Sequence, residues 1–383
     1  MLYNSKYPSI ADLKKKAKSR IPKFAFDYLE GGCNEELNLL RNENDFDDIL
    51  LQPRYLQEVG KIDMSVELFG RKYSAPFGIS PIGLQGLMWP NAPEILARAA
   101  AEQDIPYTLS TVSTASIERI AEVSNGKAWF QLYHPTEDRL RDDILRRLKD
   151  VECPVLVVLV DVPSFGLRYR EIKSGLSMPP KLNPSTILQA MRCPTWGINT
   201  LRAGIPSFAT LKPYMEKGLD LAQLGQFMNR TFTGKVTVEK IKAIRDIWKG
   251  TLVLKGIATE QDMEDALHIG VDGVIVSNHG GRQLDAAESS LHSLMRLTSN
   301  ERYRERMTIM LDGGIRSGVD LGRAHAVGSA FNFMGRPFMY GVGALGDEGG
   351  RHTINLFKAQ LYQLMQQLSL ERVEQFPERL IKR

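Results

Sequence analysis

The sequence has few of the residues that build disulfide-bonded or metal-stapled proteins. Its three cysteines, Cys33, Cys153 and Cys193, lie far apart among 383 residues and form no CxxC pair. No histidine stands near them at the spacing of a zinc site. We therefore expect neither a disulfide framework nor a metal site, and scattered free thiols indicate a reducing compartment.

Long apolar runs and blocks of charge are also missing. No stretch reaches the ~18 consecutive apolar residues of a membrane-spanning helix. Residues 1–18 are polar and rich in lysine, without the apolar centre of a secretory signal. The formal net charge is only +4 and the basic residues are dispersed, which does not favour nucleic-acid binding. The sequence thus predicts a cytoplasmic protein that does not cross a bilayer.

What the chain does contain is a repeated pattern of a short apolar run, a polar turn and an amphipathic stretch. Eight apolar runs are candidate strands, at Phe77–Ser80, Tyr107–Ser110, Ala128–Tyr133, Pro154–Val160, Thr251–Lys255, Gly273–Ser277, Thr308–Asp312 and Phe331–Gly335. Helix-like segments between them include Pro93–Gln103, Ser116–Val123, Glu137–Leu148, Val238–Trp248, Glu260–Ile269 and Val319–Val327. Such units predict an α/β protein, a TIM (β/α)8 barrel whose parallel strands are covered on both faces.

Two regions do not follow this pattern. Residues 1–65 are expected to form a helical extension before the barrel. Residues 177–233 form an insertion after the fourth strand that is far longer than an ordinary connection, as lids and binding segments are. Because no linker divides the chain, residues 1–383 are expected to form one domain.

The most informative motif is Ser-Asn-His-Gly-Gly-Arg-Gln at residues 277–283. It stands at the C-terminal end of the sixth predicted strand, where barrels of this kind gather catalytic groups. Two glycines separate His279 from Arg282 and let the backbone approach a ligand closely. A base beside a fixed cation can deprotonate a small anion while binding its carboxylate. A solvated polar loop is the alternative, but it does not require this combination of side chains.

The turns after the last two predicted strands carry glycine and arginine. The seventh strand runs into Asp312-Gly313-Gly314-Ile315-Arg316, and the eighth ends in Gly335-Arg336. In TIM barrels this region binds phosphate through backbone N–H groups and a helix N-terminus. The turns therefore predict a phosphorylated cofactor or substrate. A turn cap for Asp312 and a surface ion pair for Arg336 are the alternatives.

In chain order, the motifs PKFAFDY, FQLY, SNHGGRQ, LDGG and MGRP strongly resemble those of the FMN-dependent 2-hydroxy-acid dehydrogenases and oxidases. The likeness extends over residues 8–370, with residues 177–233 matching poorly. Around Gly166–Ser177 and Cys193–Gly197 the chain is similar to the bacterial, membrane-associated lactate dehydrogenase branch. The resemblance implies FMN as cofactor and oxidation of an L-2-hydroxy acid to the 2-keto acid. Family members often assemble as tetramers, so we also expect a homotetramer.

The resemblance also implies a role for each matching residue. His279 would take the substrate proton, with Asp161 orienting its imidazole. The substrate carboxylate and hydroxyl would be bound by Tyr28, Tyr133, Arg168 and Arg282. A further set would hold FMN, with Lys255 stabilising its reduced form: Pro81, Ile82, Gly83, Ser110, Gln131, Lys255, Ser277, Asp312, Gly314, Arg316, Gly335 and Arg336.

Three positions depart from the family pattern. Leu159 replaces a flavin-contacting Thr, Val112 stands where glycolate oxidase has Trp, and Gly83 stands where many oxidases have Ala. These residues favour lactate or a larger acid as substrate, and an acceptor other than oxygen. The alternatives are an oxygen-using oxidase, an isomerase like the type 2 isopentenyl diphosphate isomerases, and a non-catalytic flavin-binding protein.

The insertion carries apolar and aromatic side chains with basic neighbours. The apolar set is Trp196, Ile198, Leu201, Ile205, Phe208, Leu211 and Tyr214, and the basic set is Arg192, Arg202, Lys212 and Lys217. Such a composition suits a membrane interface, where the segment would bring the reduced flavin to a quinone on the cytoplasmic face. An active-site lid is the equal alternative.

Overall fold

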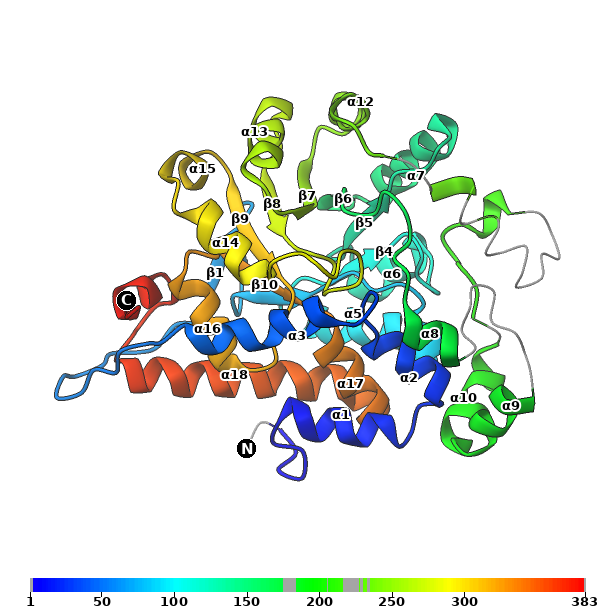
Figure 1. Cartoon of the computed structure of the whole chain (residues 1–383), viewed down its shortest axis with the longest axis horizontal. Helices are drawn as coiled ribbons and strands as arrows, with labels where there is room; N and C mark the ends of the chain where they lie inside the picture. Colours follow the sequence, from blue (N-terminus) through cyan, green and yellow to red (C-terminus); the bar gives the residue numbers. More distant parts are fainter. Residues whose placement is uncertain are drawn as a thin grey trace.

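The computed structural model describes residues 3–174, 184–204, 206–215, 227, 230–232 and 235–381. Its centre is a sheet of eight parallel strands in the order β3-β10-β9-β8-β7-β6-β5-β4 (Figure 1). They are β3 (Phe77–Ile79), β4 (Thr108–Ser110), β5 (Trp129–Tyr133), β6 (Val155–Leu159), β7 (Thr251–Ile257), β8 (Gly273–Val276), β9 (Thr308–Asp312) and β10 (Phe331–Met334). A bridge between Ile79 and Tyr107 joins the two ends of the sheet. The expected TIM barrel is thus confirmed.

The strands are buried on both faces, as continuous apolar runs require. Every residue of β6 and β8 is buried, for example. Inside the barrel, Trp129, Ile275 and Phe333 belong to one apolar cluster that also contains Leu68 and Tyr73. The last two come from an antiparallel hairpin, β1 (Val66–Leu68) and β2 (Arg71–Tyr73), that precedes the barrel. The barrel centre is therefore packed, and the open site lies at the ends of its strands.

Helices cover the outside of the barrel. They are α5 (Ala92–Glu102), α6 (Ile117–Ser124), α7 (Asp138–Asp150), α12 (Val238–Ile247), α13 (Glu260–Ile269), α14 (Ser290–Thr298), α15 (Glu301–Arg306), α16 (Gly318–Ala326), α17 (Arg336–Leu345) and α18 (Gly349–Leu368). Several start at a polar cap, since Ser116 and Thr259 accept the backbone N–H three residues on. Short elements are α4 (Gln85–Met88), η1 (Asp45–Asp48), η3 (Gly346–Glu348) and η4 (Val373–Arg379). All six helix-like segments expected from the sequence are present.

The N-terminal extension contains α1 (Ile10–Lys18), α2 (Lys23–Glu30) and α3 (Leu37–Asn44). In Figure 1, α1 runs beside α17, against which it packs. The expectation of helix up to residue 65 is wrong for residues 49–65, which contain no helix. Their backbone pairs with the C-terminal segment instead, because Gln52 N–H donates to Arg379 O at 2.7 Å and Ile381 N–H to Leu50 O at 3.0 Å.

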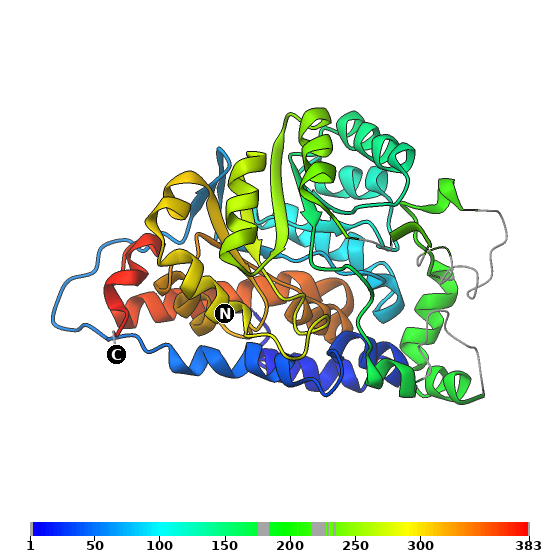
Figure 2. The same ribbon diagram turned by 45° about the horizontal axis from the view of Figure 1, so that its top comes forward.

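The described part of the insertion contains α9 (Pro184–Met191), α10 (Pro194–Ala203) and η2 (Lys212–Tyr214). In both views α9 and α10 lie at one edge of the molecule, near α2 (Figures 1 and 2). The Trp196 indole N–H donates to Leu87 O at 3.1 Å, and its ring meets Phe24 edge-on. None of the described helices has both the length and the apolar character needed to span a membrane.

This packing corrects part of the expected membrane anchor. Trp196, Phe208 and Leu211 are buried in the folded protein. Their side chains therefore cannot face lipid. Ile198 and Leu201 are exposed as expected. Ile205 and Lys217 lie outside the described residues, together with residues 177–183, 216–226, 228–229 and 233 of the insertion.

Candidate active site

A cavity of about 420 Å³ lies at the C-terminal ends of the barrel strands, within the size range of cofactor and ligand sites. Most of the expected site residues line it, namely Tyr28, Pro81, Ile82, Gly83, Ser110, Gln131, Tyr133, Arg168, Lys255, His279, Arg282, Asp312, Gly314, Arg316, Gly335 and Arg336. Asp161 and Ser277 stand behind the lining, where they contact His279 and Lys255. The structure therefore brings together side chains from all parts of the barrel.

His279 occupies a tight turn after β8. Its φ of 58° is left-handed and is followed by Gly280 and Gly281, also with positive φ. This conformation is uncommon for a non-glycine residue, although histidine adopts it more readily than most. The turn is fixed by the His279 N–H, which donates to Ser277 Oγ at 3.1 Å.

Asp161 orients the imidazole. Its Oδ1 lies 3.1 Å from His279 Nδ1, which favours the tautomer that leaves Nε2 without a proton. Burial lowers the pKa of His279, and the neighbouring Asp161 partly opposes this shift. The imidazole is therefore neutral near pH 7 and able to accept a proton. Gly256, with φ 106°, makes room for the carboxylate, because a Cβ there would lie 2.5 Å from Asp161 Cβ.

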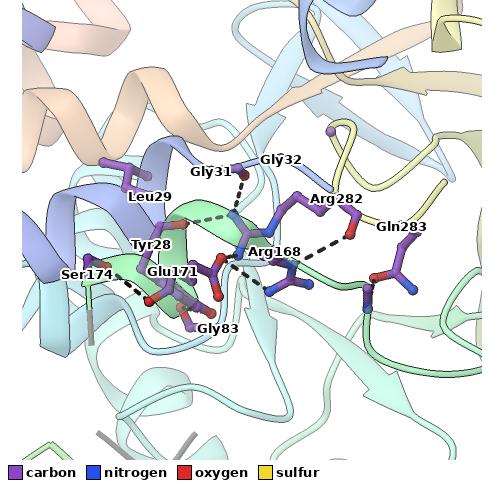
Figure 3. Close-up of polar contacts among 12 residues, drawn as sticks. Tyr28, Leu29, Gly31, Gly32, Gly83, Arg168, Glu171, Ser174, Arg282 and Gln283 are labelled. Atoms are coloured by element: carbon purple, nitrogen blue, oxygen red, sulfur yellow. Dashed lines mark hydrogen bonds and ion pairs between the residues drawn. The ribbon is translucent and has the colours of Figure 1, made fainter. Parts of the chain in front are cut away.

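Arg282 and Arg168 converge on one side of the cavity (Figure 3). Arg282 Nη1 donates to the carbonyls of Tyr28 at 2.8 Å and Gly31 at 2.7 Å, and its guanidinium stacks on the Tyr28 ring. Arg168 Nε donates to Arg282 O at 3.5 Å. Burial lowers the pKa of Arg168, and the neighbouring Arg282 cation lowers it further. Two cations held this close form a site for an anion.

Glu171 completes this cluster and was not expected from the sequence. It lies on α8 (Tyr169–Ser174), and its Oε1 is 2.6 Å from Arg282 Nη2 and 3.5 Å from Arg168 Nη1 (Figure 3). The side chain is buried and lines the cavity. Its spacing from Arg168 hints at an ion pair on one helical turn, but nothing in the sequence indicates that Arg282 joins it.

Two tyrosines face the same region. Burial raises the pKa of Tyr133 and of Tyr28, so both hydroxyls stay protonated and can donate hydrogen bonds. The surrounding wall is apolar and includes Val112, Leu159 and Phe208. Phe208 belongs to the insertion, and its place in the cavity wall agrees with the lid alternative for this residue and not with the membrane one. This part of the cavity suits an apolar substrate side chain.

Lys255 lies in the cavity wall and is held there by Ser277 and Asp312. Its Nζ donates to Ser277 Oγ at 3.0 Å and lies 3.4 Å from Asp312 Oδ2. Asp312 also accepts from Ser277 Oγ at 3.2 Å and from Ser80 Oγ at 2.6 Å. This network holds a buried ammonium in place at the cavity wall.

Gln131 supplies a hydrogen-bond donor without a protein partner. Its Oε1 accepts from Ser110 Oγ at 3.1 Å, whereas its buried Nε2 has no partner among the described residues. A buried donor left unpaired is unfavourable unless a ligand accepts its hydrogen bond. With Lys255 nearby, this arrangement fits a planar polar ring such as the expected isoalloxazine.

Arg336 lines the part of the cavity where the sequence predicts a phosphate site. Its guanidinium donates to the carbonyls of Leu29, Gly280 and Gly31, at 3.0, 3.0 and 3.1 Å. Among the residues that the structure describes, no carboxylate pairs with it, which rules out the surface ion pair considered above. Burial lowers the pKa of Arg336 to about 10, and the nearby Arg316 cation adds to the effect. A partly buried cation without a counterion fits an anionic ligand such as a phosphate.

Known proteins resemble the chain over nearly its whole length. The profile of the FMN-dependent dehydrogenase family matches residues 17–383. The L-lactate dehydrogenase of Pseudomonas syringae pv. syringae is 36% identical over 368 residues, which cover 96% of this chain and 96% of that protein.

Two solved structures are similar as well. The structure of the monotopic membrane protein (S)-mandelate dehydrogenase matches with a TM-score of 0.92 and 30% identity, covering 98% of this chain and 100% of that chain. A mandelate oxidase matches with a TM-score of 0.84 and 30% identity, covering 98% of both chains. Geometry, sequence motifs and these matches agree, and the chain belongs to the family of FMN-dependent dehydrogenases.

Proposed function

We propose that this FMN-dependent 2-hydroxy-acid oxidoreductase binds an L-2-hydroxy acid at the Arg168–Arg282 side of its cavity and FMN at the Lys255–Arg336 side. One observation carries the proposal: an oriented neutral base, His279, lines the same cavity as two guanidinium groups and as Arg336, which has no carboxylate partner among the described residues. The relatives named above act on lactate and mandelate, which are both 2-hydroxy acids.

On the substrate side, cationic residues bind the substrate carboxylate and a histidine accepts a proton. Arg282 and Arg168 bind the substrate carboxylate, and the Tyr133 hydroxyl donates to the substrate hydroxyl. His279 Nε2 takes one proton from the substrate. Asp161 keeps the Nδ1 proton in place and stabilises the imidazolium that forms.

The cofactor side holds FMN by three kinds of contact. Gln131, Ser110 and the backbone of residues 81–83 would face the ring system, and Asp312 and Ser277 would keep Lys255 beside it. Gly314, Arg316, Gly335 and Arg336 would hold the phosphate. When bound, FMN would accept the two electrons and the second hydrogen that leave the substrate as it becomes a 2-keto acid. The Lys255 cation stabilises negative charge that develops at this end of the site.

The residues of the site fit oxidation of a 2-hydroxy acid better than they fit the alternative functions. A diphosphate isomerase requires no oriented base between two carboxylate-binding arginines. A non-catalytic flavin-binding protein has no use for the His279–Asp161 pair. Apolar residues such as Val112, Leu159 and Phe208 favour a substrate with a methyl or larger side chain.

For the electron acceptor we favour a quinone at the cytoplasmic face of a membrane. On α9 and α10, Ile187, Leu188, Met191, Ile198 and Leu201 are exposed, and Leu201 reaches 85% exposure. We name these five residues the apolar face of α9–α10. One similar structure is that of a monotopic membrane protein, which supports this choice. Assembly into a homotetramer remains part of the proposal.

The membrane part is tested by flotation with liposomes that contain anionic lipids. Replacing Met191 and Leu201 by Ser is expected to lower the membrane-bound fraction, because each removes exposed apolar area from one face. Leu56→Ser is the matched control, since Leu56 is also fully exposed but lies far along the chain in the irregular segment 49–65. Equal flotation of both variants and the unmodified protein would exclude this face as the anchor.

The reaction is tested by mixing the purified yellow protein anaerobically with L-2-hydroxy acids and following the loss of flavin absorbance. L-lactate or a larger L-2-hydroxy acid should bleach the flavin, and the D enantiomer should not. A quinone analogue added afterwards should restore the colour faster than oxygen does. Faster recovery with oxygen would identify an oxidase instead, and no bleaching by any acid would refute the proposed reaction.

A further inference from the structure

Glu171 places a carboxylate between the two guanidinium groups that face the substrate. Its Oε1 contacts Arg282 Nη2 at 2.6 Å and Arg168 Nη1 at 3.5 Å (Figure 3). We name these three side chains the substrate cradle. We propose that Glu171 sets the charge of the cradle to one positive unit and thereby selects monocarboxylic over dicarboxylic 2-hydroxy acids. This inference rests on the function proposed above.

The charges of the cradle explain why it needs a carboxylate. Arg168 and Arg282 are both largely buried, and two like charges in a low-dielectric site repel each other strongly. Glu171 lies within ion-pair distance of both and reduces the repulsion. Two guanidinium groups and one carboxylate leave a single positive charge. A substrate with one carboxylate neutralises that charge, whereas a second substrate carboxylate finds no counterion there.

Glu171 does not have to leave for a substrate to bind. A guanidinium has five N–H donors. In Arg282, Nη1 serves the carbonyls of Tyr28 and Gly31, and Nη2 serves Glu171. No residue of the described segments accepts from Nε, and Glu171 takes only one of the two Nη2 hydrogens, so the Nε–Nη2 edge keeps free donors. That edge suits a bidentate carboxylate.

The helix that carries Glu171 is fixed in this position. Arg170 forms an ion pair with Glu36, and Asn34 Nδ2 donates to Tyr169 Oη at 3.3 Å. Ser174 Oγ donates to Glu171 O at 3.1 Å at the end of α8. These contacts attach α8 to the loop after α2 and keep the Glu171 carboxylate buried at the cavity wall.

A dicarboxylate meets this carboxylate as a like charge. Two unit charges about 5 Å apart in a site of intermediate dielectric repel each other enough to lower binding by about ten- to a hundredfold. The effect depends on charge and not on the length of the side chain at position 171. Charge and packing can therefore be separated with conservative variants.

The experiment measures kcat/KM of the FMN-loaded protein for L-lactate and for L-malate, which is a 2-hydroxy dicarboxylate, with a soluble dye as acceptor. In Glu171→Gln the malate-to-lactate ratio is expected to rise about tenfold or more. In Glu171→Asp, which keeps the charge, the ratio should stay near that of the unmodified protein. Glu102→Gln is the control, because it removes a carboxylate that pairs with the exposed Arg351 and does not line the cavity.

A second variant tests the same claim in the opposite direction. Arg168→Gln lowers the cradle charge by one unit, so the malate-to-lactate ratio should fall. This variant keeps the inference testable if Glu171→Gln does not retain its flavin. The flavin absorbance of each preparation shows whether the protein is folded and loaded.

Two outcomes would overturn the inference while leaving the proposed function intact. The first is an unchanged ratio in an active Glu171→Gln variant. The second is an equal rise of kcat/KM for both acids, which would mean that Glu171 is a competitor displaced by the substrate. If the unmodified protein oxidises no L-2-hydroxy acid, the proposed function itself fails.

Discussion

At the residue scale, the proposed chemistry depends on the groups that surround the imidazole of His279. His279 is held by Asp161 and by a left-handed turn, and burial lowers its pKa below the ordinary value of 6.5. A base must be neutral to accept a proton. The lowered pKa therefore keeps His279 neutral, and so able to act as the proposed base, at more acidic pH than a solvent-exposed histidine.

This argument predicts the acid limb of the pH–activity profile. The kcat/KM for an L-2-hydroxy acid should fall on acidification with a midpoint below 6.5. In Asp161→Asn the midpoint should move to still lower pH, because Asp161 raises the pKa of His279. Its kcat should drop by about 10² to 10⁴, because the imidazole loses the partner that fixes its tautomer. A midpoint above 6.5, or one that rises in Asp161→Asn, would contradict this assignment.

A second residue-scale prediction concerns Gly83. A Cβ added there would lie 2.8 Å from Val112 Cγ2 and 3.3 Å from Tyr28 Oη. Gly83→Ala alone should therefore raise KM for L-lactate, because Val112 and Tyr28 must move. The double variant Gly83→Ala with Val112→Ala should recover most of the loss, as steady-state kinetics can show. Equal KM values in the single variant and the unmodified protein would mean that the wall is not tightly packed.

At the scale of elements, the insertion acts as part of the cavity wall. Phe208 lines the cavity, and Trp196 ties α10 to Leu87 in α4, next to the cavity-lining Met88. The insertion, which does not follow the barrel pattern in the sequence, thus contacts the proposed substrate site. The position of Phe208 supports the lid interpretation for residues 206–215.

Trp196 offers a test of this coupling. Trp196→Ala removes a buried indole and its hydrogen bond to Leu87 O, so it should destabilise the protein by about 3–5 kcal/mol at most. It should also raise KM, because the covering segment loosens. Thermal unfolding and steady-state kinetics measure the two effects. Trp196→Phe keeps the ring contact with Phe24, so it should be destabilised less and its KM should rise less. An unchanged KM in Trp196→Ala would mean that the insertion does not affect substrate binding.

The elements that could be predicted from the sequence are those whose burial requires a recognisable pattern of apolar residues. The barrel strands are buried on both faces, so each is a short continuous apolar run ending in a polar turn, as at residues 273–283. The β1–β2 hairpin was missed because its three-residue strands carry no such run. Glu171 was missed, and the choice between lid and membrane contact was left open for Phe208, because both depend on how distant segments meet in space.

At the scale of the whole molecule, one cavity contains both the proposed substrate site and the proposed phosphate site. Arg336, at the proposed phosphate site, contacts the carbonyls of Leu29 and Gly31, which lie next to Tyr28 at the proposed substrate site. Helix α2 and the loop after it therefore touch both sites. Cofactor binding is expected to stabilise the N-terminal extension together with the barrel.

This arrangement predicts a link between FMN and stability. Added FMN should raise the Tm of the flavin-free protein, since a ligand that binds only the folded state stabilises it. Arg336→Met should reduce that rise and weaken FMN binding, because the phosphate loses its unpaired buried cation. Arg351→Met is a suitable control, since Arg351 is an exposed partner of Glu102. An equal rise of Tm in all three proteins would exclude Arg336 as a phosphate ligand.

The most direct test is a crystal structure of the protein with FMN and a 2-keto acid product bound. We predict that the carboxylate contacts Arg282 and Arg168, that the keto oxygen faces Tyr133 and His279, and that the FMN phosphate contacts Arg336. A product carboxylate bound away from both arginines, or a phosphate bound away from Arg336, would contradict this assignment of the cavity.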